Sequence, residues 1–169
     1  MNDTIARLLN EQINKEFYSA YLYLDISNYY DRLDLDGYAN DYMIQAQEER
    51  DHALLFLKYM QNNGLQITFK PIEKPNQVFD SILKPLEVAA EHERYVTGLI
   101  NEIYHACHQA RDYRTMKFLD WFVDEQMEEE EKADKMISRY QLFGADPKGL
   151  YALDQEYAGR VYAAPSLVL

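Results

Sequence analysis

The segment Glu48 to His52, with the sequence EERDH, has the residue types and the spacing that best suit a metal ion. In a helix, Glu49 and His52 lie three residues apart and project from the same face. A carboxylate oxygen and an imidazole nitrogen then point toward one position. Iron, manganese and zinc accept this mixture of ligands. We therefore expect Glu49 and His52 to form one side of a metal site.

Three other glutamates, Glu16, Glu93 and Glu129, fall on mostly apolar stripes that must face inward when helices pack. Removing carboxylates from water costs several kcal/mol for each charge, and like charges drive some of them to bind protons. The stripes carry no matching Lys or Arg. Two divalent cations would neutralise the four glutamates, with His52 as the nitrogen ligand. The absence of a cysteine cluster argues against a structural zinc site.

Each of these residues also has a simpler interpretation when it is taken alone. A glutamate in so acidic a chain usually lies on a solvated helix face. A single histidine such as His52 is more often a core or surface residue with ordinary hydrogen bonds than a ligand. The metal site is favoured by the joint placement of four acids and one histidine near the middle of four helices. The stripe of the fourth helix also includes Glu125.

The elements that must position these side chains are long helices. The 169 residues include only six glycines and five prolines, which disfavours many short strands and turns. Apolar residues recur at helical spacing, and Ser81 is a possible cap of the third helix. Gly64 and Gly144 are placed to end the second and fourth helices. The expected helices span about residues 4–33, 38–63, 81–110 and 112–143.

Two connections define the predicted topology. Residues 34–37 make a short loop, so the second helix should return antiparallel to the first. Residues 64–80 contain Pro71 and Pro75 and can extend about 56 Å, whereas the second helix is about 40 Å long. This segment can therefore cross the whole bundle. We predict an all-α, four-helix bundle with a long crossover between helices two and three.

A short fifth helix is predicted from Asp146 and Pro147, an N-cap followed by a first-turn proline, to about Tyr157. One domain over residues 1–157 is then followed by a tail, residues 158–169. Because the tail is apolar for a terminus, we expect it to fray or to dock on a neighbouring subunit.

Composition excludes several classes of partner. With 29 acidic residues against 17 Lys and Arg, the net charge of −12 repels nucleic acid and anionic membrane surfaces. No apolar run approaches the length of about 20 residues that spans a bilayer. No secretory signal is visible at the start of the chain. The single cysteine, Cys107, allows no intrachain disulfide and is expected in the core, so a cytoplasmic location is the default.

Four stretches resemble the ferritin family over nearly the whole chain: Asn10 to Tyr23, the EERDH segment, His92 with Glu93, and Glu125 to Glu129. The non-haem branch is matched best. A Gln126-x-x-Glu129 pattern replaces a second Glu-x-x-His, and Arg50 stands where haem-binding relatives have methionine. No Cys-x-x-Cys pair for an iron–sulfur module is present. The resemblance therefore implies iron and no haem.

The resemblance also implies a role for each site residue. One iron would be bound by Glu16, Glu49 and His52, and the second by Glu49, Glu93 and Glu129, with Glu49 as the bridge. Gln126 would lie beside them as a weak ligand or as a partner of one. The matching residues of a third iron site are Glu48, Glu125, Glu128 and Glu129, although a run such as 128–131 is more often a solvated face.

Tyr23 matches a tyrosine near the di-iron site that supplies an electron during oxygen reduction, and Trp121 would assist it. For both residues the alternative is ordinary aromatic core packing, since the chain has 15 tyrosines.

The implied function is iron storage with ferroxidase activity. Two Fe(II) ions are oxidised by O2 or H2O2, and the product is kept as mineral in a hollow shell of about 24 subunits. Two alternatives remain open. One is a di-metal oxidase or peroxide-scavenging enzyme on the same bundle, and the other is a structural or signalling bundle that binds no metal.

Overall fold

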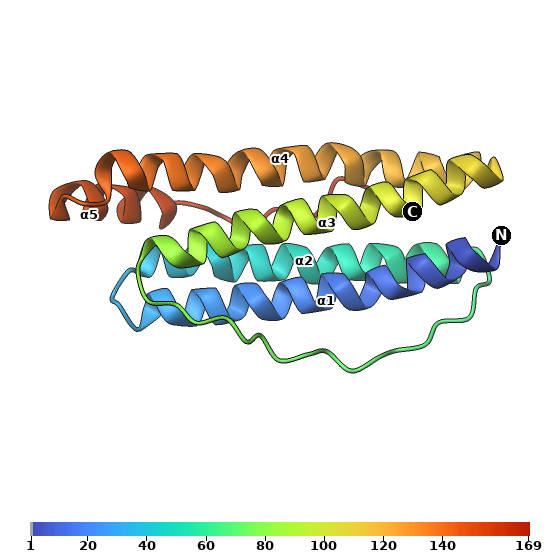
Figure 1. The fold of residues 1–169 in the computed structure, drawn as a ribbon, viewed down its shortest axis with the longest axis horizontal. Coiled ribbons are helices and arrows are strands. Elements are labelled where there is room, and N and C mark those ends of the chain that lie inside the picture. The colour runs from blue at the N-terminus through green and yellow to red at the C-terminus, as the bar shows by residue number, and fades with distance from the viewer. Residues whose placement is uncertain (1) are drawn as a thin grey trace.

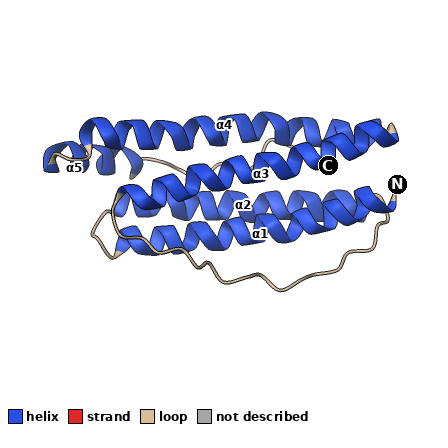
Figure 2. Ribbon diagram, in the orientation of Figure 1, coloured by secondary structure: helices blue, strands red, loops and turns tan. Residues whose placement is uncertain are grey.

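A computed structural model describes residues 2–169, which contain five α-helices and no strand (Figure 2). The expected all-α fold with a fifth helix is confirmed. The predicted start of the domain at Met1 lies outside the described residues. Across residues 2–169, none of the helices has the length and apolarity needed to pass through a bilayer. The helices are α1 (Asp3–Asp31), α2 (Asp36–Asn62), α3 (Leu83–Ala110), α4 (Tyr113–Phe143) and α5 (Pro147–Tyr157).

The four long helices form a bundle in which α1 and α2 are antiparallel and α3 runs in the direction of α2 (Figure 1). The two helices α2 and α3 can run in the same direction because the connection 63–82 travels the length of the bundle beside α1. Asn10 fixes this connection to α1 by donating to the Thr68 carbonyl at 3.0 Å and accepting from the Thr68 amide at 2.8 Å. The predicted crossover is therefore present.

Local capping explains where most helices begin. The side chain of Asn2 accepts a hydrogen bond from the Thr4 amide, and Asp112 and Asp146 cap α4 and α5 in the same way. Gly64 adopts a φ of +65° just after α2, a conformation that favours glycine. These short-range signals are visible in the sequence, so the expected boundaries differ from the observed ones by only about two residues.

The start of α2 is capped from a distance. The residue before it, Leu35, offers no capping side chain. Instead Asp154 of α5 accepts hydrogen bonds from the backbone amides of Gly37, at 2.8 Å, and Tyr38, at 3.1 Å. A side chain at position 37 would collide with the backbone carbonyl of Asp154. Glycine is therefore required for α5 to dock at this point.

The interior consists of two hydrophobic clusters with a polar layer between them. The first cluster packs the start of α1 against the ends of α2 and α3 and includes the buried Cys107. The second packs the end of α1 against the start of α2 and includes Leu153 of α5. Burying a large apolar side chain contributes about 1.5–3 kcal/mol, so the clusters offset the cost of the polar layer. The buried polar residues of the layer are Gln12, Glu16, Ser19, Gln45, Glu49, His52, Glu93, Gln126 and Glu129.

The tail after α5 lies along its own chain, so the expectation that it frays is wrong, whereas its docking on a neighbouring subunit stays a prediction. It runs back beside the bundle from the end of α5 (Figure 1). The Tyr162 hydroxyl donates to Asp51 at 2.5 Å, and Ser166 accepts from the indole nitrogen of Trp121 at 2.9 Å. These contacts involve α2 and α4. The apolar composition of the tail does not indicate them, because they are made by polar side chains.

Candidate metal centre

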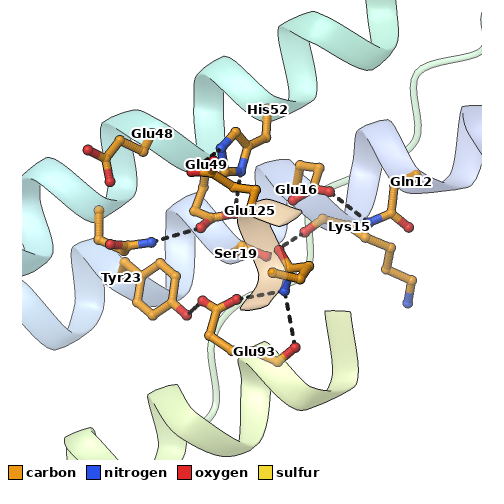
Figure 3. A network of polar contacts seen from close by, with 12 residues as sticks. Gln12, Lys15, Glu16, Ser19, Tyr23, Glu48, Glu49, His52, Glu93 and Glu125 are labelled. Carbon is orange, nitrogen blue, oxygen red and sulfur yellow. Dashed lines mark hydrogen bonds and ion pairs between the residues drawn. The ribbon is translucent and has the colours of Figure 1, made fainter. Parts of the chain in front are cut away.

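Glu16, Glu49 and His52 converge in the polar layer. One ligand atom from each lies within 4.8 Å of the other two. Glu16, Glu49 and His52 are only 1%, 2% and 2% exposed. Glu16 comes from α1, and the other two project from one face of α2 as their three-residue spacing requires (Figure 3). This is a set of two oxygen donors and one nitrogen donor around one point.

Glu93 and Glu129 reach the same layer from α3 and α4, and both are buried. Burial, followed by the charges of Glu49 and Glu129, raises the pKa of Glu93 well above its ordinary value. Glu93 and Glu129 also line one small cavity together with Tyr23 and Gln45. The hydroxyl of Tyr23 donates to Oε1 of Glu93 (Figure 3). The four glutamates and the histidine thus occupy one buried layer of the bundle.

Three glutamine side chains hold three of these carboxylates. Gln12 donates to Oε1 of Glu16 at 2.7 Å, and Gln45 donates to Oε1 of Glu49 at 3.1 Å. Gln12 and Gln45 each lie four residues before their partners and therefore on the same helix face. This repeated Gln-x-x-x-Glu spacing is readable in the sequence, although it was not among the expected site features. Such hydrogen bonds fix the orientation of a carboxylate and satisfy its buried oxygens.

The third glutamine is Gln126, and it corrects the expected stripe of α4. Gln126 is 4% exposed and donates from Nε2 to Oε2 of Glu93 at 3.1 Å. The side chain of Glu125 is 27% exposed instead. Successive inward positions are therefore Phe122, Gln126 and Glu129. Adjacent residues lie about 100° apart around the helix, so only one of positions 125 and 126 can face inward.

Protons and hydrogen bonds compensate the buried charges of these side chains. Burial and the charge of Glu49 raise the pKa of Glu16 to about 8. Burial alone would lower the pKa of His52, but the hydrogen bond and charge of Glu49 and the charge of Glu16 raise it to about 10. The pKa of Glu49 is lowered, because its interactions with His52 and Gln45 outweigh burial. A metal ion would have to displace protons from this cluster.

Three of the four proposed ligands of the third position, all except Glu129, are more exposed. Oε1 of Glu125 lies 3.8 Å from Nε2 of His52, and burial raises the pKa of Glu125 to about 7. Glu128 is exposed. Glu48 is directed to Arg160 of the tail, with 2.5 Å between its Oε2 and the guanidinium. No local pattern indicates this cation, because Arg160 lies 112 positions from Glu48 along the chain.

The aromatic candidates differ in their relation to the centre. Tyr23 is 1% exposed, contacts Glu93 and stacks on Tyr42 with 5.7 Å between ring centroids. Trp121 contacts the edge of His52, with 5.5 Å between centroids. Both lie beside the buried layer, and both also pack in the core. Their geometry accommodates either role considered from the sequence.

Comparison with known proteins agrees with this geometry. A sequence model of the ferritin-like domain matches residues 6–149. The bacterial non-haem ferritin of Campylobacter jejuni is 36% identical over 155 residues, covering 92% of this chain and 93% of its own. That of Staphylococcus epidermidis is 36% identical over 162 residues, covering 96% and 98%. The crystal structure of an open-pore ferritin from the archaeon Archaeoglobus fulgidus aligns with a TM-score of 0.93 at 37% identity, covering 95% and 99%. The chain therefore belongs to the ferritin family.

Proposed function

We propose that the protein is a ferroxidase that stores iron. The observation that carries this proposal is the buried cluster of Glu16, Glu49 and His52, with Glu93 and Glu129 in the same layer. Ferritin-family membership supports iron as the metal. Carboxylates are hard anionic donors that stabilise Fe(III) more than Fe(II), which favours oxidation. A site with one histidine and four carboxylates suits oxidation followed by release.

In this proposal Fe(II) is the substrate. Glu16, Glu49 and His52 bind one ion, Glu49, Glu93 and Glu129 bind the other, and Glu49 bridges them. Each Fe(II) gives up one electron. With O2 as acceptor, two electrons and two protons yield H2O2, and with H2O2 they yield two water molecules. Gln45 keeps Glu49 in its bridging orientation, and Tyr23 and Gln126 hold the Glu93 carboxylate.

The product is proposed to enter a store. Glu48, Glu125 and Glu128 lie at or near the surface of the same region and, with Glu129, form a third iron position on the way out of the centre. The storage compartment is a shell of about 24 subunits. Exposed apolar side chains on the outer face of α1 and α2, including Tyr21, Leu24 and Met43, support assembly through this face. A cytoplasmic location suits both Fe(II) and the free thiol of Cys107.

The proposal is tested by combining oxygen uptake with the iron content of the assembled protein. Metal-free protein receives Fe(II) without oxygen, O2 is then admitted, and the sample is separated by size exclusion. We expect O2 uptake in proportion to Fe(II), and many irons per subunit eluting with a large assembly. The exposed Glu102 on α3 supplies a matched control, because Glu102→Gln should leave both values unchanged.

The rival functions give different results in the same experiment. A di-metal oxidase or peroxide-scavenging enzyme would consume oxidant, but only the irons of the centre would elute with the protein. A structural or signalling bundle would neither bind Fe(II) nor accelerate O2 uptake. Either result would reject storage.

A further inference from the structure

The tail places one cation at the edge of the metal centre. Residues 158–169, which we call the strap, leave α5 and run back along the bundle (Figure 1). Three contacts fix its course: Arg160 to α2, Tyr162 to Asp51 of α2, and Ser166 to Trp121 of α4. Leu167 packs against the first hydrophobic cluster. The position of Arg160 is therefore fixed by α5, which precedes it in the chain, and by Tyr162, which follows it.

The guanidinium of Arg160 makes four hydrogen bonds, all to α2. One nitrogen donates to the backbone carbonyl of Asp41 at 2.9 Å and to its carboxylate at 3.0 Å. The other donates to the Gln45 side chain at 3.1 Å and to Glu48 at 2.5 Å. The side chains of Arg160 and Glu48 are 20% and 17% exposed. A charge-assisted pair that is this short and mostly shielded is stronger than an exposed surface pair.

The surroundings of Glu48 contain other acidic groups. Glu129 and Glu125 are close enough for their charges and that of Glu48 to influence one another. A metal ion bound there would share this carboxylate with the guanidinium, which holds its Oε2. It would also lie near a fixed positive charge, which repels a cation. Binding at this position is therefore weakened while Arg160 stays on Glu48.

We propose that Arg160 is a built-in competitor of iron for Glu48. While the strap is seated, the guanidinium occupies Glu48 and the third position binds iron weakly. When iron takes Glu48, the guanidinium is released and the strap loosens at residues 158–164. The consequence is brief occupancy, so iron passes through this position instead of remaining there. This inference rests on the proposed function, because it assumes that iron visits the third position.

A different role for the same contacts is orientation of Glu49. The side-chain oxygen of Gln45 accepts hydrogen bonds from Arg160 and from Lys132, the latter at 2.5 Å. Two cations on this oxygen force the amide nitrogen toward Glu49, to which it donates. In that case loss of Arg160 would weaken iron binding at the two buried positions. Competition predicts stronger binding at the third position instead.

The two roles are distinguished by calorimetric titration with Fe(II) in the absence of oxygen. Arg160→Gln removes the charge and keeps a hydrogen-bonding side chain. We expect the third Fe(II) to bind about tenfold more tightly in this variant, because the position gains a free carboxylate. Glu48→Gln should remove that gain in the double variant. Arg7→Gln, which removes an exposed cation paired with Glu11 on α1, should bind the third Fe(II) as the wild type does.

A third-site affinity that is unchanged or weaker in Arg160→Gln would overturn the proposal. A second measurement uses the wild type alone and does not depend on the variants folding. Filling the third position should increase amide hydrogen exchange in residues 158–164, and equal exchange with two and three Fe(II) per subunit would also overturn it. Failure of the proposed function looks different, because the wild type would then not bind the first two Fe(II) ions.

Discussion

Glu49 and His52 face each other inside α2, with 3.5 Å between Oε2 of the carboxylate and Nδ1 of the imidazole. The other oxygen of Glu49 accepts from Gln45. Glu49 therefore has both carboxylate oxygens in the buried layer, whereas His52 directs a single ring nitrogen, Nδ1, toward Glu49. We expect Glu49→Gln to lose Fe(II) binding at both buried positions and to slow the first oxidation at least about a hundredfold.

By the same geometry, His52→Ala should weaken mainly one of the two positions. Titration with Fe(II) without oxygen counts the sites, and stopped-flow absorbance measures the first oxidation. Glu102→Gln on the exposed face of α3 controls for the loss of one negative charge. If Glu49→Gln oxidises Fe(II) as fast as the wild type, Glu49 is not the bridge.

Tyr23 connects the aromatic core to the metal centre through its hydrogen bond to Glu93. Tyr23→Phe keeps the ring that stacks on Tyr42 and removes only the hydroxyl. Because a lost buried hydrogen bond costs about 1–3 kcal/mol, the variant should fold but hold Glu93 less firmly. If Tyr23 also supplies an electron, an organic radical seen by rapid-freeze electron paramagnetic resonance after O2 addition should disappear.

The control for this experiment is Tyr59→Phe. Tyr59 is also buried and hydrogen-bonded, to Thr115, but it belongs to the first hydrophobic cluster. Its loss should leave the radical unchanged. A radical of equal yield in Tyr23→Phe would assign Tyr23 to core packing and to the support of Glu93 alone.

Most of the fold follows from short-range patterns in the sequence. Caps such as Asn2 and Asp112 lie next to the helices they start, and Gly64 follows the helix it ends. The crossover is expected because a proline-containing segment is long enough to span the bundle. Inward-facing acids such as Glu16 are recognisable because a charged residue interrupts an apolar stripe.

The contacts that were missed join residues far apart in the chain. Asp154 caps α2 across 117 positions, and Arg160 reaches Glu48 across 112. Neither pairing leaves a local signal, because the residues share no helix face. The error between Glu125 and Gln126 is of another kind. Adjacent residues lie about 100° apart around a helix, so Glu125 and Gln126 flank the apolar stripe on opposite sides, and periodicity alone does not decide which one faces inward.

The metal-free centre should make stability fall as pH rises. Glu16 has a pKa of about 8 in the folded protein against 4.5 as its ordinary value, so the folded state holds more protons than the unfolded chain between these values. His52, raised from 6.5 to about 10, acts the same way up to higher pH. Its stabilising effect is complete below pH 6.5 and is lost as pH rises through about 10. Excess bound protons in the folded state mean decreasing stability with rising pH.

The temperature at the midpoint of thermal unfolding, measured with a chelator at fixed protein concentration, should therefore decrease as the pH is raised from about 5 to about 9. Glu16→Gln replaces the titrating group with a neutral one of similar shape and should flatten the decline. Adding a divalent metal should reverse part of it, because metal binding displaces protons and strengthens with pH. A midpoint that rises with pH in the metal-free protein would contradict the assigned directions.

Asp154 should stabilise the junction of α2 and α5 without affecting the metal centre. Asp154→Ala leaves the amides of Gly37 and Tyr38 without their acceptor, and loss of a helix cap costs about 0.5–2 kcal/mol. We expect faster hydrogen exchange at these two amides, a lower thermal midpoint and an unchanged Fe(II) affinity. Asp146→Ala is the matched control, since Asp146 caps α5 at an exposed position. Asp154 is buried, so its loss should cost more than that of Asp146. Equal stability of the two variants would show that α5 docks chiefly through its apolar contacts, such as that of Leu153 with the second hydrophobic cluster.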